Sequence, residues 1–294
     1  MRMRSDAATI FVAGTIIFCG ACTKAPMEKA ASSFTVVSQS ALGEKACGPC
    51  ALYHAFVNGS QELRAIAETL PGQTAEERVR NLMNTESGKP SIVFGKWRRR
   101  YSDQHGETAV DLLEAANELL TGRGLSKVSG IILDRMKGEA PSTHLSRIRG
   151  YLSDSIGAGF PPIVEVRAMA ARKSDAGYTW TDICAHTFTV LETQPQSTAS
   201  VTDMGFWIRI ADSTTGQVDT SFVHVQGCQT FLAPREFTVS NDGEPQWTWA
   251  SEQYPFLEVT VPTTTYFREK EPAIERTLIF LRYAIVRELT VPKK

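Results

Sequence analysis

Residues 46–56 read Ala46-Cys47-Gly48-Pro49-Cys50-Ala51-Leu52-Tyr53-His54-Ala55-Phe56 and place a cysteine at the expected start of a helix. Pro49 suits the first helical turn, because the N–H that proline lacks has no partner there. Leu52 and Phe56 then follow at the spacing of one apolar helix face. The free N–H groups and the positive dipole end of a helix start stabilise a thiolate, the form of cysteine that attacks carbonyls. This stretch therefore predicts a reactive Cys47.

Gln39 lies eight positions before Cys47 and carries a side-chain amide that donates hydrogen bonds. Together with the backbone N–H of Cys47, this amide is expected to hold the negative oxygen that forms when a thiolate attacks a carbonyl. The same region thus predicts a nucleophile and an oxyanion hole.

The order Gln, then Cys-Gly-Pro-x-Ala-Leu, resembles the nucleophile motif of the C39-type family of papain-like cysteine peptidases. Three later segments are similar to further family motifs and follow in the family's order. Gly159–Val166 resembles a Gly-x-Pro-aliphatic strand, Ala185–Leu191 the strand of the general base, and Trp207–Gly216 a strand with an Asp turn. Gly106–Leu113 is similar to a helix of the family. The resemblance spans residues 39–216.

This resemblance implies a Cys-His-Asp triad. Cys47 is the implied nucleophile, His186 the general base, and Asp212 the carboxylate that fixes the histidine tautomer. Gln39 takes the oxyanion role. The implied function is a thiol hydrolase, either a cysteine peptidase or an amidase, that acts on a peptide or protein substrate with no cofactor and no metal.

Helical periodicity dominates the first half of the chain, and short β-type runs dominate the second. This pattern predicts an α+β class, and the resemblance implies a papain-like arrangement with the nucleophile helix in the helical half and an antiparallel β second half. Residues 34–230 are expected to form the papain-like domain, and residues 231–294 a β-rich C-terminal extension of the same domain. The expected helices are Ala51–Asn58, Gln61–Leu70, Thr74–Asn84, Thr108–Leu120 and Leu145–Ser155, and the expected strands are Pro162–Val166, His186–Glu192, Phe206–Ala211, Ser221–Val225, Phe256–Val261 and Arg276–Val286.

The first 22 residues have the form of an export signal. A short basic start precedes an apolar run over residues 7–18, which is too short to span a bilayer comfortably. Small residues then precede Cys22, and this resembles the lipobox of bacterial lipoproteins, which implies lipidation of Cys22. Residues 23–33 are small and polar, as expected of a tether. We expect an exported chain that is anchored by lipid to the cell envelope at its periplasmic face, with a secreted or periplasmic chain and an uncleaved anchor as alternatives.

Composition argues against nucleic acid as a partner. The 294 residues include 31 Lys and Arg against 32 Asp and Glu, for a net charge of −1. The one dense basic cluster is Trp97-Arg98-Arg99-Arg100-Tyr101, which is more typical of a solvated face than of a phosphate site. The expected partners are therefore a substrate and, through the lipid, a membrane.

Other functions fit the same cysteines. Cys47 and Cys50 form a Cys-x-x-Cys pair, which is typical of thiol-disulfide oxidoreductases. With Cys184 and His186 they would also make a chemically adequate zinc site. A catalytically inactive binding lipoprotein, in which these residues are only structural, is the remaining alternative.

Overall fold

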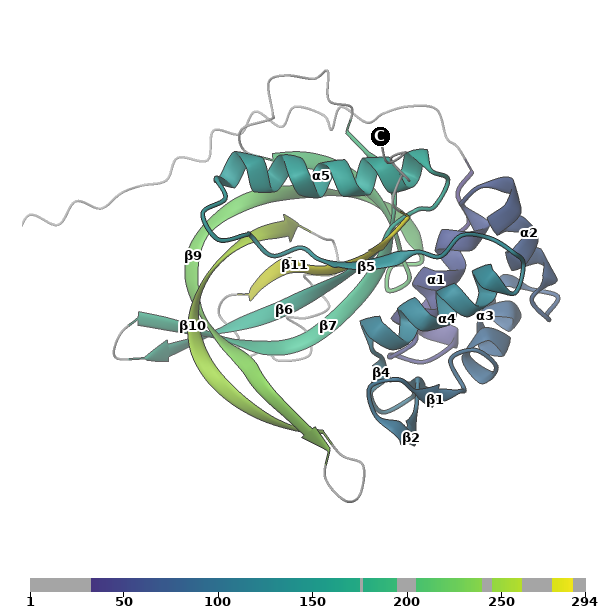
Figure 1. Ribbon diagram of the computed structural model, residues 1–294, viewed down its shortest axis with the longest axis horizontal. Coiled ribbons are helices and arrows are strands. Elements are labelled where there is room, and N and C mark those ends of the chain that lie inside the picture. The colour runs from purple at the N-terminus through teal and green to yellow at the C-terminus, as the bar shows by residue number, and fades with distance from the viewer. Residues whose placement is uncertain (1–32, 175–176, 195–204, 240–244, 261–276, 288–294) are drawn as a thin grey trace, which may run out of the picture.

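The computed structural model describes residues 33–174, 177–194, 205–239, 245–260 and 277–287. It combines a group of helices with a large curved sheet (Figure 1). The predicted export signal, the lipidation of Cys22 and nearly all of the predicted tether lie outside the described residues.

The helices lie close to the predicted windows. The sequence Thr74-x-x-Glu77 forms a capping box, in which the Thr74 hydroxyl accepts from the Glu77 N–H and the Glu77 carboxylate accepts from the Thr74 N–H. A short 3-10 helix, η1, covers Gln39–Ala41. The α-helices are α1 (Cys47–Val57), α2 (Gln61–Thr69), α3 (Ala75–Asn84), α4 (Ala109–Thr121) and α5 (Pro141–Gly157).

Most of the strands belong to one antiparallel sheet in the order β10-β9-β8-β7-β6-β11-β5. An additional pairing of Glu258 with Phe280 joins β10 to β11 and closes six strands into a barrel, with β5 outside it. The sheet strands are β5 (Ser129–Ile132), β6 (Ile163–Ser174), β7 (Gly177–Thr193), β8 (Gly205–Asp212), β9 (Gln217–Val239), β10 (Pro245–Thr260) and β11 (Thr277–Val286), and the small hairpins are β1 (Pro90–Ser91) with β2 (Gly95–Arg99) and β3 (Tyr101–Ser102) with β4 (Gly106–Glu107).

The papain-like α+β prediction is wrong. The described chain is mostly sheet: a six-stranded antiparallel barrel with one outside strand and five helices, rather than a helical half followed by a β half. One reason is that the helical half contributes β5 to the sheet, where it pairs with β11. A second reason is strand length, since β9 covers 23 residues and β10 covers 16.

Two hydrophobic cores hold the helices against the barrel. The first surrounds α1, whose Leu52, Tyr53 and Phe56 are fully buried among side chains of the other helices and of Ile163 at the start of β6. The second lines the barrel with alternating strand residues and is covered by Ile148 of α5. Figure 1 shows α5 lying across the barrel, while α1 to α4 pack together at its side.

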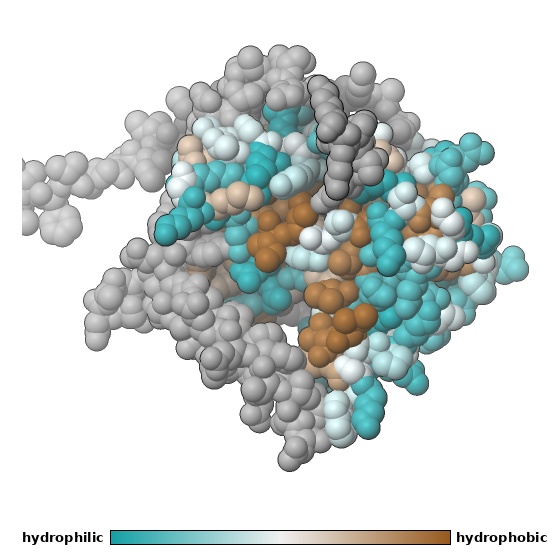
Figure 2. Space-filling view, viewed as in Figure 1, coloured by the Kyte–Doolittle hydropathy of each residue, from teal (hydrophilic) through white to brown (hydrophobic). Residues whose placement is uncertain are grey.

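Hydrophilic side chains cover much of the helical side (Figure 2). Brown patches interrupt this face of the molecule. Among the described residues, Ile132 on β5 and Val110 at the start of α4 are large apolar side chains that are exposed. None of the helices in the described ranges has the length and apolar character needed to cross a bilayer.

Candidate active site

Cys47 is the first residue of α1 and is partly exposed. Burial alone would raise the pKa of its thiol. The hydrogen bond and positive charge of His186, and the backbone N–H groups of Thr187 and Gly48, outweigh that effect and lower the pKa below its usual value. The helix start therefore favours the thiolate of Cys47 more than an ordinary site would.

His186 lies on β7 and is nearly inaccessible, with 4% of its surface exposed. Its Nε2 atom lies 2.8 Å from Oδ1 of Asp212, which leaves Nδ1 as the ring nitrogen for Cys47. Burial lowers the pKa of the imidazole, but the charge and hydrogen bond of Asp212, together with Cys47, raise it to about 10. The raised pKa of His186 and the lowered pKa of Cys47 both favour a thiolate–imidazolium pair over two neutral groups.

Asp212 ends β8 and is fully buried. Its Oδ1 also accepts a 2.9 Å hydrogen bond from the backbone N–H of Thr214. Burial raises the pKa of this carboxyl, and the charge and hydrogen bond of His186 bring it below its usual value. The turn after Asp212 closes at Gly216, which has a φ of +66° and leaves only 3.0 Å between an added Cβ and the Cβ of Ser38. A side chain there would strain the turn and push against the segment that leads to Gln39.

Gln39 opens η1 and lies beside the same turn. Its backbone N–H donates to the Ser213 carbonyl at 2.9 Å, and its Oε1 accepts from the Ser213 hydroxyl at 2.8 Å. Its Nε2 donates to the Glu44 carbonyl at 3.1 Å. That contact uses one of the two amide hydrogens, so a second is left for an oxyanion. The structure thus brings Gln39 next to Asp212 and ties it to the turn rather than directly to Cys47.

Hydrogen bonds between side chains and backbone fix α1 to the barrel and to the segment before η1. The hydroxyl of Thr189 on β7 donates a 2.7 Å hydrogen bond to the Ala51 carbonyl in α1. On the same helix, Nε2 of His54 accepts from the Val37 N–H at 2.8 Å. Burial lowers the pKa of His54 to about 4, so this histidine is neutral and has a structural role.

Cys47 and Cys50 are both free thiols. Cys50 is fully buried, and its pKa is raised by burial and by the negative charge of Cys47, against a hydrogen bond from Ser213. Within the described ranges, no group of three or more His, Cys, Asp or Glu side chains is arranged to hold a metal ion. The structure therefore does not assemble the alternative zinc set of Cys47, Cys50, Cys184 and His186.

Glu107 is a site residue that sequence reasoning missed. Its side chain lies against Gly48, because a Cβ added at Gly48 would lie 3.4 Å from the Glu107 Cβ and 3.6 Å from Oε2. Oε2 accepts from the Ser87 hydroxyl at 3.1 Å, while Oε1 is buried and has no hydrogen-bond partner in the described chain. Burial raises the pKa of this carboxyl to about 8, and Asp111 and Cys47 add to that effect against Arg100. A neutral carboxyl therefore borders the nucleophile at neutral pH.

The only sequence signal for Glu107 is its place just before the helix-capping Thr108. The hydroxyl of Thr108 accepts from the Asp111 N–H at 3.1 Å and so starts α4. This cap places β4, with Glu107 at its end, beside α1. The pattern that marks the cap carries no information about the burial of Glu107.

Comparison of the chain with family models, with curated proteins and with solved structures finds no match.

Proposed function

We propose that the chain is a thiol hydrolase that cleaves a peptide or amide bond through Cys47, His186 and Asp212. The observation that carries this proposal is the continuous chain of hydrogen bonds from Cys47 through His186 to Asp212, with the pKa of the thiol lowered and that of the imidazole raised. The motifs that resemble those of C39-type cysteine peptidases support the same chemistry, as does the predicted export to the cell envelope for a peptide or protein substrate.

The reaction begins with attack of the Cys47 thiolate on the substrate carbonyl carbon, which forms a C–S bond and a negative oxygen. The Cys47 backbone N–H and the second Gln39 amide hydrogen stabilise that oxygen. His186 gives its proton to the leaving amine as the C–N bond breaks, and a thioester remains on Cys47. Neutral His186 then takes a proton from water, which attacks the thioester and releases the acid and the thiolate. Asp212 keeps the imidazole in one orientation throughout.

Alkylation by iodoacetamide at about pH 6, well below the usual thiol pKa of about 8.5, tests the nucleophile. We expect the wild type to label at Cys47, Cys47→Ala to lose this label, and His186→Ala to label far more slowly. Cys50→Ala is the matched control and should label as fast as the wild type. Release of a fluorescent amine from casein-derived amides should follow the same order. Unchanged labelling in His186→Ala would overturn the proposal.

The need for Cys50 distinguishes the oxidoreductase alternative from the hydrolase. Insulin reduction that requires both Cys47 and Cys50 would favour it. Of these two cysteines, the hydrolase requires only Cys47, because Cys50 is buried and has a raised pKa.

A further inference from the structure

The fold divides the basic run at residues 97–101. Arg100 and Tyr101 are buried, with 4% and 8% of their surface exposed, whereas Trp97 is 60% exposed. Arg99 and Lys96 are exposed on either side of this tryptophan. The run is therefore not a uniform solvated face, because Arg100 and Tyr101 are buried while Trp97 and Arg99 are exposed to solvent.

The hairpin of β1 and β2 carries the exposed half. Pro90 pairs with Arg99 and Ser91 with Gly95, so residues 96–98 have no partner on β1 and form a bulge. Trp97 lies in this bulge, and Ile92, which is 54% exposed, lies in the turn between the two strands. The hairpin thus presents two large apolar side chains to solvent, at the edge of the helical group in Figure 1.

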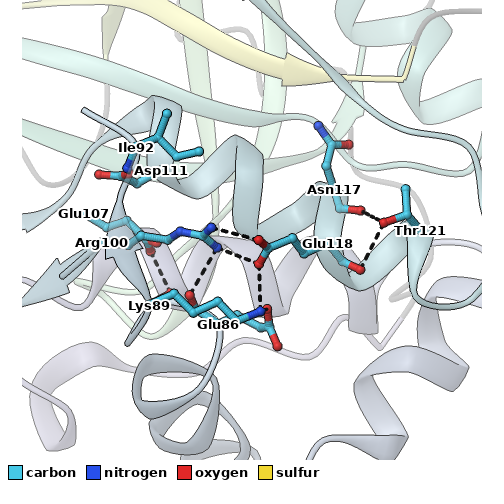
Figure 3. A network of polar contacts seen from close by, with 10 residues as sticks. Glu86, Lys89, Ile92, Arg100, Glu107, Asp111, Asn117, Glu118 and Thr121 are labelled. Atoms are coloured by element: carbon cyan, nitrogen blue, oxygen red, sulfur yellow. Dashed lines mark hydrogen bonds and ion pairs between the residues drawn. The ribbon is translucent and has the colours of Figure 1, made fainter. Parts of the chain in front are cut away.

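Two acidic side chains near the hairpin, Glu118 and Glu86, are paired with cations, and Asp111 is buried beneath it, where it accepts hydrogen bonds from the Ile92 N–H and the Ser91 hydroxyl. The Glu118 carboxylate forms ion pairs with Arg100 at 2.7 Å and with Lys89 at 2.9 Å, and Lys89 forms a second ion pair with Glu86 at 2.6 Å (Figure 3). Neither Lys96 nor Arg99 forms an ion pair with a residue in the described ranges; the Lys96 ammonium lies 5.5 Å from the centre of the Trp97 ring. The hairpin surface therefore combines uncompensated positive charge with apolar area.

We propose that this surface, formed by Ile92, Lys96, Trp97 and Arg99, docks on an anionic phospholipid bilayer. Tryptophan prefers the boundary between headgroups and acyl chains, and lysine and arginine are attracted to anionic headgroups. Exposed Ile92 and Trp97 favour a bilayer over nucleic acid, since an aliphatic side chain gains little from phosphates and bases. The expected lipid anchor at Cys22 would hold the hairpin near such a surface, and the inference does not depend on the hydrolase chemistry.

Tryptophan quenching by brominated phospholipids tests the docking in the full chain bound to vesicles. In vesicles of phosphatidylcholine with phosphatidylglycerol, we expect quenching that is absent in Trp97→Phe, which assigns it to this side chain among the five tryptophans. Lys96→Gln with Arg99→Gln should weaken docking roughly 25-fold, at about fivefold for each basic residue near an anionic surface. Salt at about 1 M should also weaken docking, because it screens charges beyond about 3 Å.

A matched control alters an equally exposed apolar and basic pair elsewhere. Met136→Ser with Lys137→Gln, in the loop before α5, should leave the quenching unchanged. Equal quenching of wild type and Trp97→Phe would overturn the proposal, as would quenching of equal size in vesicles of phosphatidylcholine alone. Loss of binding to a DNA oligonucleotide in the Lys96 and Arg99 variant, with quenching unchanged, would assign the surface to nucleic acid and reject the bilayer.

Discussion

The hydroxyl of Ser213 donates a 2.8 Å hydrogen bond to Oε1 of Gln39 and joins residues that lie 174 positions apart. The backbone N–H of Gln39 donates to the Ser213 carbonyl in return. This double contact ties the segment before the nucleophile to the turn after Asp212. The placement of Gln39, the proposed oxyanion donor, therefore depends on the turn whose Asp212 contacts His186.

Ser213→Ala should lower the free energy of unfolding by about 1 kcal/mol, because Gln39 Oε1 loses its donor in buried surroundings. Amide hydrolysis should slow more than alkylation of Cys47, since the proposed mechanism gives Gln39 a contact with the oxyanion and none with the thiolate. Urea unfolding and the two rates measure these effects. Ser40→Ala, which removes an exposed hydroxyl, should change none of them. Equal losses in both rates would contradict the role of Gln39.

Asp212→Asn should change the pH profile of Cys47. Without the carboxylate, the pKa of His186 falls from about 10 toward its usual value, and the Cys47 thiolate loses its cationic partner. Alkylation at about pH 6 should slow roughly tenfold for each unit by which the pKa of Cys47 rises. Asp219→Asn is the control, because Asp219 accepts from Thr215 at 2.6 Å and lies outside the triad. An unshifted profile in Asp212→Asn would argue against the triad.

Glu107→Gln should gain stability relative to the wild type as pH rises. Burial raises the pKa of Glu107 to about 8 in the folded chain, so its contribution is fully present below an unfolded pKa of about 4.3 and is lost as pH rises through 8. The gain in unfolding free energy should reach up to about 1.4 kcal/mol per pH unit between these values and then level off. Urea unfolding at several pH values measures it.

Glu118→Gln is the control, because its stability relative to the wild type should change with pH in the opposite direction. Arg100 lowers the pKa of Glu118 to about 2, so its contribution is present above the unfolded pKa and is lost as pH falls through 2. This variant should be less stable than the wild type at neutral pH and should approach it in acid. A Glu107→Gln difference that does not vary with pH would show that this carboxyl is ionised in the folded chain.

Thr189→Val should weaken the contact between β7 and α1. The variant removes the 2.7 Å hydrogen bond that Thr189 donates to the Ala51 carbonyl, and the loss of this one buried hydrogen bond should cost about 1 kcal/mol. Thermal unfolding measures the cost. Thr189→Ser keeps the hydroxyl and should retain most of the stability. If valine and serine are equivalent, the hydrogen bond contributes nothing to the docking of α1.

Local patterns in the sequence predict the helices well. Caps at Thr74 and Thr108 and the apolar spacing of α1 and α4 are properties of short windows, and the structure places these helices within a few residues of the prediction. Cys47, His186 and Asp212 were predicted from motif order, and the structure brings all three together. Their catalytic roles stay predictions.

The barrel could not be predicted because its decisive features are not local. The Ala168-Met169-Ala170-Ala171-Arg172 stretch of β6 has residues that favour helices, and pairing with β7 and β11 overrides that preference. Pro234 and Pro255 would be expected to end strands, because proline cannot donate a hydrogen bond within a sheet. β9 and β10 nevertheless continue past them, with register shifts beside both positions. The closing pair of Glu258 and Phe280 joins strands whose approach no short window encodes.

The position of β11 far behind Cys47 in the sequence sets when a reactive thiol can arise during synthesis. A ribosome makes the helix that carries Cys47 long before it makes residues 277–286. Until β11 is made, β6 lacks a partner on one edge, β5 has no sheet to join, and β10 has nothing to close against. We therefore expect the nascent chain to carry Cys47 as an ordinary thiol until β11 has been made, and the pairing of Cys47 with His186 to form only after that.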